Sequence, residues 1–379
     1  MLKGRKIKIH KIAPRALATA AAAVFVLIVA ACEDEPYYLR LDRWGWVTGF
    51  PENVERLKAV AEGPNGDVYV VASDVTIPDY PRAVVYRYNR SGLEEVFRGP
   101  YDNAYFDDLA FGGGALWVCG KKYVGYGYEP YLVRSEAAKW AEIDVPSSVD
   151  VTELTAVFPV SRDSCWLETS RAVYVYDGGR WAEAFRADGF RRNLKLAVAE
   201  TGRAFVCVTS LKPAKRTIYV SDDSGATWAA ETMDLGTDLY DFYDYPSCVQ
   251  AAGAGLFIST LVRSESLEKK SAPVYMAVVG RDDAEPGKGN YDISYLALST
   301  WEYGYYVRGM AFRDEDNGYV VGYETSIARE GGKWYPEDIW HAGYTYFAAV
   351  TAGRSTYWAT IEARGYGGHD REYYLYRVE

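Results

Sequence analysis

The sequence predicts an all-β protein on three observations. The 379 residues include 34 Tyr and 11 Trp against 4 Met, and aromatic residues favour strands. Short alternating runs lie between Gly-rich turns, and almost no segment has the 3.6-residue period of an amphipathic helix. One apolar, aromatic run recurs about every 48 residues, usually just after a glycine. This interval lies in the range of propeller blades.

Each repeat contains four expected strands. The recurring run, as at Val68–Val71, follows a strand with Ala or aliphatic residues, as at Leu57–Ala61. An alternating strand comes next, as at Val84–Tyr88, and a fourth strand often opens with Trp, as at Trp181 and Trp334. The recurring runs start at residues 68, 116, 165, 205, 256, 319 and 357. We therefore expect a seven-bladed β-propeller of four-stranded antiparallel blades.

The two ends of the chain suggest how this ring closes. The last repeat stops at Glu379 after its third strand, so its fourth strand is missing. The segment Tyr38–Trp46 precedes the first full repeat and has the pattern of a strand. Placing this N-terminal strand in the last blade would remove exposed strand edges. Residues 38–379 are accordingly predicted to form a single propeller domain.

The N-terminus has the pattern of an export signal. Residues 1–15 are basic and residues 16–30 are apolar, the order of regions in a secretory signal peptide. Val29-Ala30-Ala31-Cys32 resembles the lipobox of bacterial lipoproteins, in which the cysteine is diacylated and becomes the new N-terminus. We expect a signal peptide at 1–31, lipidation at Cys32 and an acidic tether at 32–37. The alternatives are a simple membrane anchor or a cleaved signal with an incidental cysteine.

This interpretation assigns the protein to the bacterial cell envelope. Lipid chains on Cys32 would hold the body at the outer membrane or at the periplasmic face of the inner membrane. Residues 1–31 carry six basic residues and no acid, so the remainder has 36 Lys and Arg against 52 Asp and Glu. A body with a net charge of −16 repels phosphate backbones, which argues against nucleic-acid binding.

Cysteine and histidine usage gives no sign of a metal or cofactor. Cys119, Cys165, Cys207 and Cys248 lie in separate apolar runs without a C-x-x-C spacing, which favours buried free thiols, although a Cys207–Cys248 pair is an alternative. Only two histidines follow the signal, and neither has a zinc or Ser-His-Asp motif around it. Acid-rich stretches lack the spacing of an EF-hand loop. No metal and no cofactor are expected.

One turn carries a recognisable motif. Ser221, Asp223, Gly225 and Trp228 match the Asp-box, S-x-D-x-G-x-x-W. The segment Met310–Trp334 looks like the repeats of photosystem-assembly-factor-like propellers. Residues 38–379 thus resemble the Asp-box (BNR-repeat) propeller group, which includes sialidases, sortilin-type receptors and assembly factors. This resemblance implies that the motif is a structural turn between the two outer strands of a blade, away from the central channel.

The loops between the expected strands are rich in Tyr, Gly and Asp. The loops that link blades, and those that join second and third strands, meet at one face of a propeller. The candidate ligand-binding residues in these loops are Tyr101, Tyr105, Tyr126, Tyr128, Tyr243, Tyr305, Trp340 and His341. Tyr and Gly are frequent in binding loops because Tyr gives a large contact area at low entropic cost. Alternatively, these aromatic residues only pack on one another to order long loops.

Three arginines suggest an enzyme as an alternative function. Arg56, Arg192 and Arg308 each lie at or before the first strand of a blade, so they could point into one channel mouth, as in sialidases. The chain has one Asp-box and no Arg-Ile-Pro, which departs from the sialidase pattern. Glu168 is unusual because it directly follows an apolar run. It either faces the channel with a raised pKa or bonds to the backbone of a neighbouring blade.

These observations favour a non-catalytic binding or assembly module over an enzyme. Its expected partner is an envelope protein or a glycan, and the chain is expected to be a monomer. No catalytic residue is assigned. The alternative is a carbohydrate-active enzyme of sialidase or glycoside-hydrolase type, and a third possibility is a structural lipoprotein without a ligand. An enzyme would show an acid pair or a Tyr–Glu pair in a deep pocket, whereas a binding module would show an open aromatic rim.

Overall fold

The structure is a computed structural model that describes most of the chain. The described residues are 40–41, 43–136, 139–147, 149, 152–187, 192–211, 214–233, 246–252, 255–263, 274–282, 290–297, 307–322, 325–337, 339–340, 344–364 and 371–378. The expected signal peptide, Cys32 and the acidic tether lie outside them. In this part of the chain every regular element is a strand, and no helix is long and apolar enough to span a bilayer.

The strands form seven four-stranded antiparallel sheets and one two-stranded sheet. The first three sheets are β3 (Val54–Glu62), β4 (Val68–Asp74), β5 (Arg82–Asn89) and β6 (Gly92–Arg98); β7 (Ala104–Gly112), β8 (Ala115–Val124), β9 (Gly127–Glu136) and β10 (Lys139–Glu142); and β11 (Ala156–Pro159), β12 (Ser164–Glu168), β13 (Ala172–Asp177) and β14 (Arg180–Arg186). The next two are β15 (Arg192–Val198), β16 (Ala204–Leu211), β17 (Ala214–Ser221) and β18 (Ala229–Met233); and β19 (Pro246–Ala252), β20 (Gly255–Arg263), β21 (Val274–Asp282) and β22 (Asn290–Ala297). The last two are β23 (Val307–Phe312), β24 (Gly318–Gly322), β25 (Thr325–Glu330) and β26 (Lys333–Glu337); and β28 (Tyr344–Ala352), β29 (Tyr357–Arg364), β30 (Arg371–Val378) and β2 (Gly45–Gly49).

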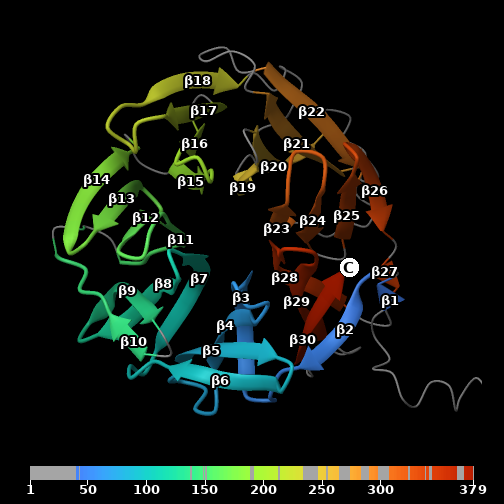
Figure 1. Cartoon of the computed structure of the whole chain (residues 1–379). Helices are drawn as coiled ribbons and strands as arrows, with labels where there is room; N and C mark the ends of the chain where they lie inside the picture. Colours follow the sequence, from blue (N-terminus) through green and yellow to red (C-terminus); the bar gives the residue numbers. More distant parts are fainter. Residues whose placement is uncertain are drawn as a thin grey trace, which may run out of the picture.

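The four-stranded sheets fan around a central axis (Figure 1). Strands β3, β7, β11, β15, β19, β23 and β28 line the centre, and β6, β10, β14, β18, β22 and β26 lie at the outer rim. In these six sheets the strands follow the chain from the centre outward, each paired with the next. The prediction of an all-β propeller with four-stranded antiparallel blades is confirmed.

The last sheet takes one strand from the N-terminal part of the chain. Strand β2 pairs with β30, with Gly45 opposite Arg377 and Gly49 opposite Tyr374. The short strand β1 (Arg40–Leu41) pairs with β27 (Ile339–Trp340), so the chain enters beside the sheet that precedes the last one. Because β2 covers the outer edge of β30, that edge offers no free hydrogen-bonding groups along the paired residues.

Apolar side chains fill the spaces between neighbouring sheets. One cluster joins Val71 and Val85 of the first sheet to Phe106, Leu116 and Val118 of the second, all at most 3% exposed. The second strands have apolar side chains on both faces, and five consecutive residues of β24 are buried. This packing explains why these strands read as continuous apolar runs, since a strand buried on both sides needs no alternation.

Buried carboxylates also join the sheets. Glu168 is 1% exposed, and its Oε2 accepts a 2.6 Å hydrogen bond from the backbone N–H of Leu196 in the next sheet. Likewise, Asp108 Oδ2 accepts a 2.9 Å hydrogen bond from the backbone N–H of Val157 in the next sheet. Of the two alternatives for Glu168, the structure shows the bond to the backbone of a neighbouring sheet.

The Asp-box lies in the turn between β17 and β18, the two outer strands of their sheet. Asp223 Oδ1 accepts the backbone N–H of Thr227 at 2.8 Å, and Ser221 Oγ accepts that of Gly225 at 2.8 Å. Gly225 has φ +89°, and the Trp228 indole donates to the carbonyl of Ala184 in the preceding sheet at 2.8 Å. These contacts give the motif a structural role at the outside of the ring.

The four cysteines of the body, all among the described residues, form no disulfide. Cys119, Cys165 and Cys207 are buried, and Cys248 is partly buried. The alternative of a Cys207–Cys248 disulfide is therefore wrong for this structure. Burial in apolar surroundings raises the pKa of Cys119 and Cys165, which keeps both thiols protonated and unreactive.

Candidate functional site

The innermost strands carry β-bulges near their first residues. In β3 the pairing shifts between Glu55 and Ala59, and in β7 it shifts around Asp107. The same irregularity occurs at Arg308 in β23 and at Ala348 in β28. A bulge leaves an extra residue outside the ladder and redirects its side chain. Because all innermost strands run in the same sense, these redirected residues meet at one end of the channel.

A pocket of 620 Å³ opens at this end, and we call it the mouth pocket. It is lined by residues from four sheets, namely Arg56, Leu57, Lys58, Ser73, Tyr105, Phe106, Asp107, Lys121, Tyr128, Arg308, Tyr346, Phe347, Ala348 and Glu362. Four of these residues are cationic and two are anionic, in a chain whose net charge is −10. The lining of the mouth pocket therefore has more cationic than anionic side chains, an arrangement that favours anions.

Arg56 has a strained backbone at the centre of its bulge. Its φ is +56°, a left-handed conformation that non-glycine residues adopt rarely. Such strain persists where the surroundings enforce it, often at functional sites. The guanidinium carbon lies 5.0 Å from the ring centroid of Tyr105, which holds it over the aromatic face. Among the described residues, neither Arg56 nor Arg308 forms an ion pair.

The remaining charges form a connected group inside the mouth. Lys58 Nζ lies 3.8 Å from Asp107 Oδ1, and Lys121 Nζ lies 2.6 Å from Glu153 Oε2. Burial raises the pKa of Asp107, and the positive charge of Lys58 only partly opposes this effect. The second oxygen of Asp107, Oδ2, is buried and accepts no hydrogen bond from the described residues. Asp107 is therefore the carboxyl group of the mouth pocket with an unused acceptor.

Tyrosines form one side of the mouth. The ring centroids of Tyr105 and Tyr128 lie 6.3 Å apart, and those of Tyr123 and Tyr128 lie 5.4 Å apart. Lys121 Nζ is 5.2 Å from the ring centroid of Tyr128. These three tyrosines pack on one another, as expected if the aromatic residues of these loops serve to order the loops. Tyr126 differs from them, because it is fully exposed at the tip of the β8–β9 turn.

Two loops at this face present apolar side chains to solvent. Ile77 and Tyr80 in the β4–β5 loop are 53% and 55% exposed, and Val124 stands beside Tyr126 in the β8–β9 turn. Both loops are tied to the segment before β7: the Ala104 N–H donates to the carbonyl of Pro81, and the Tyr123 N–H to that of Asn103. We call Ile77, Tyr80, Tyr123, Val124 and Tyr126 the apolar rim.

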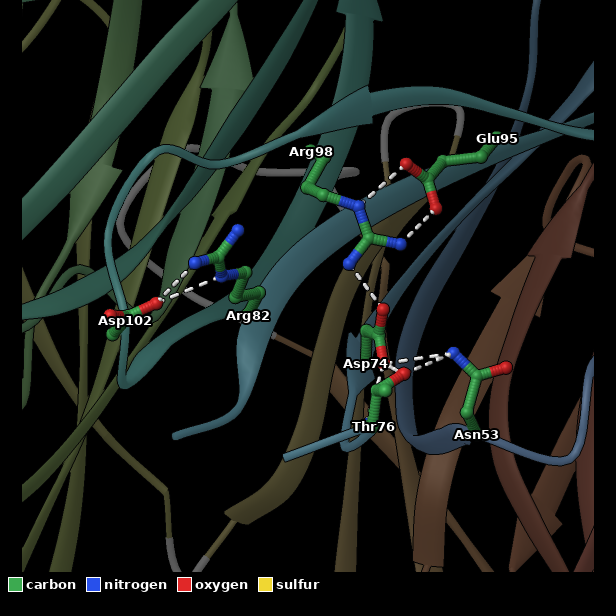
Figure 2. A network of polar contacts seen from close by, with 7 residues as sticks. All are labelled: Asn53, Asp74, Thr76, Arg82, Glu95, Arg98 and Asp102. Atoms are coloured by element: carbon green, nitrogen blue, oxygen red, sulfur yellow. Dashed lines mark hydrogen bonds and ion pairs between the residues drawn. The ribbon is translucent and has the colours of Figure 1, made fainter. Parts of the chain in front are cut away.

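A polar network holds the β4–β5 loop in place (Figure 2). The buried carboxylate of Asp74 accepts hydrogen bonds from the side chains of Asn53 at 2.8 Å and Thr76 at 2.6 Å, and from Arg98. Arg98 also bonds Glu95, at 2.9 Å. Burial alone would raise the pKa of Asp74, but these donors outweigh it and hold the pKa well below its usual range. Asp74 thus stays ionised and fixes the base of the loop that carries Ile77 and Tyr80.

The structure brings together some of the expected site residues. Tyr105, Tyr128, Arg56 and Arg308 all line the mouth pocket, although they come from three sheets. Tyr101 does not line the mouth pocket. Its hydroxyl donates to Glu142 at 2.9 Å and its ring packs against Tyr131, and its ligand-binding role stays a prediction. Tyr243, Tyr305 and His341, and the side chains of Arg192 and Trp340, lie outside the described residues.

Several residues of the mouth pocket were not predicted. Lys58, Asp107, Lys121, Tyr346 and Glu362 resemble ordinary charged or aromatic residues at strand ends. The adjacent Asp107 and Asp108 were one usable signal, because two acids in a strand expected to be apolar suggest an irregular strand. Among the described residues, no group of three or more His, Cys, Asp or Glu side chains is placed to hold a metal ion.

Comparisons with known proteins agree on the fold. No protein-family model matches the sequence, and no curated protein is similar to it. The chain is similar to a crystal structure of a protein of unknown function from Dyadobacter fermentans DSM 18053, with 10% identity, 91% of this chain and 100% of that chain covered, and a TM-score of 0.50. It is also similar to the β-propeller domain of Cps50 (Swd1) from Myceliophteria thermophila, with 9% identity, 89% and 100% coverage and a TM-score of 0.53. At these identities the similarity shows the fold alone.

Proposed function

We propose that this protein is a lipid-anchored binding module of the bacterial envelope. It binds an anionic glycan or an envelope protein at the mouth pocket and the apolar rim, without catalysing a reaction. The observation that carries the proposal is the mouth pocket itself, where bulged inner strands direct Arg56, Lys58 and Arg308 toward one opening. Strained backbone and redirected side chains cost stability, so their concentration at one opening supports a binding role.

Charge and aromatic surface support an anionic glycan as the favoured ligand. Arg56 and Arg308 have no carboxylate partner among the described residues, and guanidinium groups match carboxylates, sulfates and phosphates well. The exposed ring of Tyr126 offers flat apolar surface of the kind on which sugar rings pack. An acidic envelope protein that docks on the apolar rim is the alternative ligand class.

The proposal includes a lipid anchor at the N-terminus and a closed ring of seven blades. Cys32 is the proposed lipidation site, and the protein works as a monomer at the outer membrane or at the periplasmic face of the inner membrane. We take each of the seven four-stranded sheets as one blade of a single ring, which β2 closes against β30. The Asp-box turn on the outer strands supports a relationship to the BNR-repeat propellers, with a structural role for Ser221, Asp223, Gly225 and Trp228.

The proposal is tested by capture from the native envelope. The full chain, its R56Q/R308Q variant and its Y126A variant are incubated with envelope extract, and recovered material is analysed for both glycan and protein. Both variants should recover at least tenfold less of one defined component, and recovery should fall as salt is raised. The matched controls are R90Q and Y335A, because Arg90 and Tyr335 are exposed residues that do not line the mouth pocket. Equal recovery by all variants, with folding intact, would exclude the mouth as the binding site.

A carbohydrate-active enzyme is the second candidate, and Asp107 is the observation that favours it. Its raised pKa and its unused buried oxygen are properties of a general acid, and Glu362 supplies a second carboxylate to the same pocket. A D107N variant separates the two functions. Loss of glycan cleavage with retained glycan binding would favour the enzyme, whereas absence of any cleavage by the unmodified protein across acidic glycans it binds would favour the binding module.

A further inference from the structure

A second pocket lies at the opposite ends of the strands. It has a volume of 880 Å³ and sits between the sheet of β23–β26 and the sheet that contains β2. Four arginines line it, namely Arg43, Arg313, Arg329 and Arg377. They come from the β23–β24 turn, the end of β25, the end of β30 and the segment that precedes β2. We call this site the arginine pocket.

The carboxylates of the arginine pocket are already engaged. Both oxygens of Asp314 accept bonds within their own turn, at 2.8 Å from the Asp316 N–H and at 2.8 and 3.1 Å from the Asn317 amide. Glu330 pairs with Arg43. The two acids that line the pocket are thus engaged elsewhere, and among the described residues neither of them pairs with Arg313 or Arg329.

Arg313 and Arg329 are the arginines without a carboxylate partner among the described residues. The guanidinium carbon of Arg313 lies 4.4 Å from the ring centroid of Tyr357. That of Arg329 lies 4.9 Å from the ring centroid of Trp334, and its Nε donates to the carbonyl of Glu315 at 2.8 Å. Stacking on a ring holds a guanidinium plane while leaving its N–H groups free to donate. The two side chains are therefore oriented before any ligand arrives.

We propose that the arginine pocket binds a phosphate group through Arg313 and Arg329. A phosphate ester carries one or two negative charges on several acceptor oxygens, so it can take paired hydrogen bonds from two guanidiniums at once. A single carboxylate offers only two oxygens and one charge. The pocket lies at the opposite strand ends from the mouth pocket, so this site does not depend on the ligand proposed there.

The phosphate has two chemical sources, a phospholipid headgroup or a soluble phosphate ester. Arg43 follows Cys32 by eleven residues, and an extended chain of this length spans at most about 40 Å. If Cys32 is lipidated, the arginine pocket is therefore held within that distance of a membrane surface. This geometry makes a headgroup available to the pocket at high local concentration.

The experiment uses the full chain purified in a non-ionic detergent, with glycerol 3-phosphate as the soluble probe and calorimetry as the readout. Nanodiscs of phosphatidylglycerol and of phosphatidylcholine provide the lipid arm. R313Q/R329Q should weaken binding of the phosphate probe at least tenfold, whereas R90Q/R180Q, at two exposed residues that line neither pocket, should leave it unchanged. R313K/R329K, which keeps the charge but not the planar fork, should lose less affinity than the glutamine variant.

Comparison of glycerol 3-phosphate with the nanodiscs identifies the source of the phosphate group. Displacement of glycerol 3-phosphate by phosphatidylglycerol nanodiscs, dependent on both arginines, indicates a headgroup site, and binding of glycerol 3-phosphate alone indicates a soluble ester. The proposal is overturned if neither probe binds, or if R313Q/R329Q binds as tightly as the unmodified chain. It is also overturned if acetate displaces the probe as effectively as inorganic phosphate. Circular dichroism of each variant shows whether lost binding reflects lost folding.

Discussion

Oε2 of Glu168 accepts the backbone N–H of Leu196 across the boundary between two sheets, at 2.6 Å. Its other oxygen, Oε1, accepts hydrogen bonds from Lys195 at 2.9 Å and from the Thr155 hydroxyl at 2.8 Å. Glu168 is 1% exposed, so its carboxylate is shielded from water, whereas the Lys195 side chain is 35% exposed. One acid at the end of β12 therefore joins three segments of the ring, and it replaces the backbone ladder that two separate sheets cannot form.

Replacing Glu168 should weaken the whole ring. In an E168A variant, the Leu196 N–H and the Lys195 ammonium lose a buried acceptor, and breaking such a pair costs about 3–5 kcal/mol of unfolding free energy. E168Q keeps an acceptor for Leu196 but not the charge for Lys195, so its loss should be smaller. Urea denaturation followed by tryptophan fluorescence measures both values.

Glu94 provides the control for this change. It pairs with Arg87 at 2.5 Å on the exposed surface of the first sheet. An exposed pair contributes about 1 kcal/mol or less, so E94Q should change the unfolding free energy little. Equal effects of E168A and E94Q would show that the bond to Leu196 does not stabilise the ring.

The sequence predicts the second strand of each sheet, counted from the centre of the ring, better than any other part of the fold. The expected runs start at residues 68, 116, 165, 205, 256, 319 and 357, and the second strands start within one residue of each. These strands are buried on both faces, as in β24, so their apolar runs are continuous and easy to recognise. The rim strands are half exposed, as in β6, and their pattern is correspondingly weaker.

The mouth pocket was predicted only in part, because its shape depends on bulges. Arg56 and Arg308 could be placed at strand starts from the repeat pattern. No residue type marks a position where two residues lie opposite one across a ladder, so the pairing of Lys58 with Asp107 in the mouth pocket is not evident from the sequence. The contact of Tyr101 with Glu142 is likewise not evident from the sequence, because Glu142 lies in an outer strand and sequence spacing does not show this contact.

Gly225 in the Asp-box turn should not tolerate a side chain. Its φ is +89°, and a Cβ there would lie 2.8 Å from Cη2 of Trp166 and 3.0 Å from Cβ of Ala184. Trp166 is 2% exposed and cannot move aside. G225A combines backbone strain with overpacking, so we expect a loss of about 2–4 kcal/mol, measured as a lower thermal midpoint.

A change at Gly178 separates the cost of backbone strain from the cost of overpacking. Its φ is +53°, but a Cβ there would meet no atom within 4 Å. G178A should therefore cost only the backbone term, about 1 kcal/mol. If G178A is as destabilising as G225A, contact with Trp166 is not the cause.

Trp44 should be the main apolar contact of the N-terminal segment. It is 4% exposed, its indole N–H is 3.1 Å from both Ser326 Oγ and Glu337 Oε2, and its ring centroid lies 5.0 Å from that of Tyr319. A W44A variant leaves a cavity between the last two sheets, with an expected loss of about 3–5 kcal/mol. W46A, at a site that is 55% exposed, should cost far less. Similar denaturation midpoints for the two variants would contradict a stabilising role of this segment.

Asp108 should make the stability of the ring depend on pH. Burial raises its pKa to about 7, and the nearby charge of Glu168 adds to this effect, while hydrogen bonds from Val157 and Leu109 and the charge of Lys195 oppose it. In the unfolded chain an Asp has a pKa of about 3.9. Between these two values the unfolded chain releases a proton that the folded chain retains. The folded state therefore loses stability as pH rises from about 4 to about 7, and this group adds no further change above that.

The D108N variant removes this titration while keeping an oxygen that can accept the Val157 N–H. Between pH 5 and pH 8, the unfolding free energy of the unmodified chain should fall relative to that of D108N, by an amount on the order of 2 kcal/mol. D177N is the control for an aspartate-to-asparagine change at an exposed position, because Asp177 is exposed at the end of β13. Urea midpoints at a series of pH values give the comparison. Parallel profiles for the unmodified chain and D108N would mean that Asp108 is ionised in the folded protein throughout this range, with the charge of Lys195 and the hydrogen bonds from Val157 and Leu109 outweighing its burial.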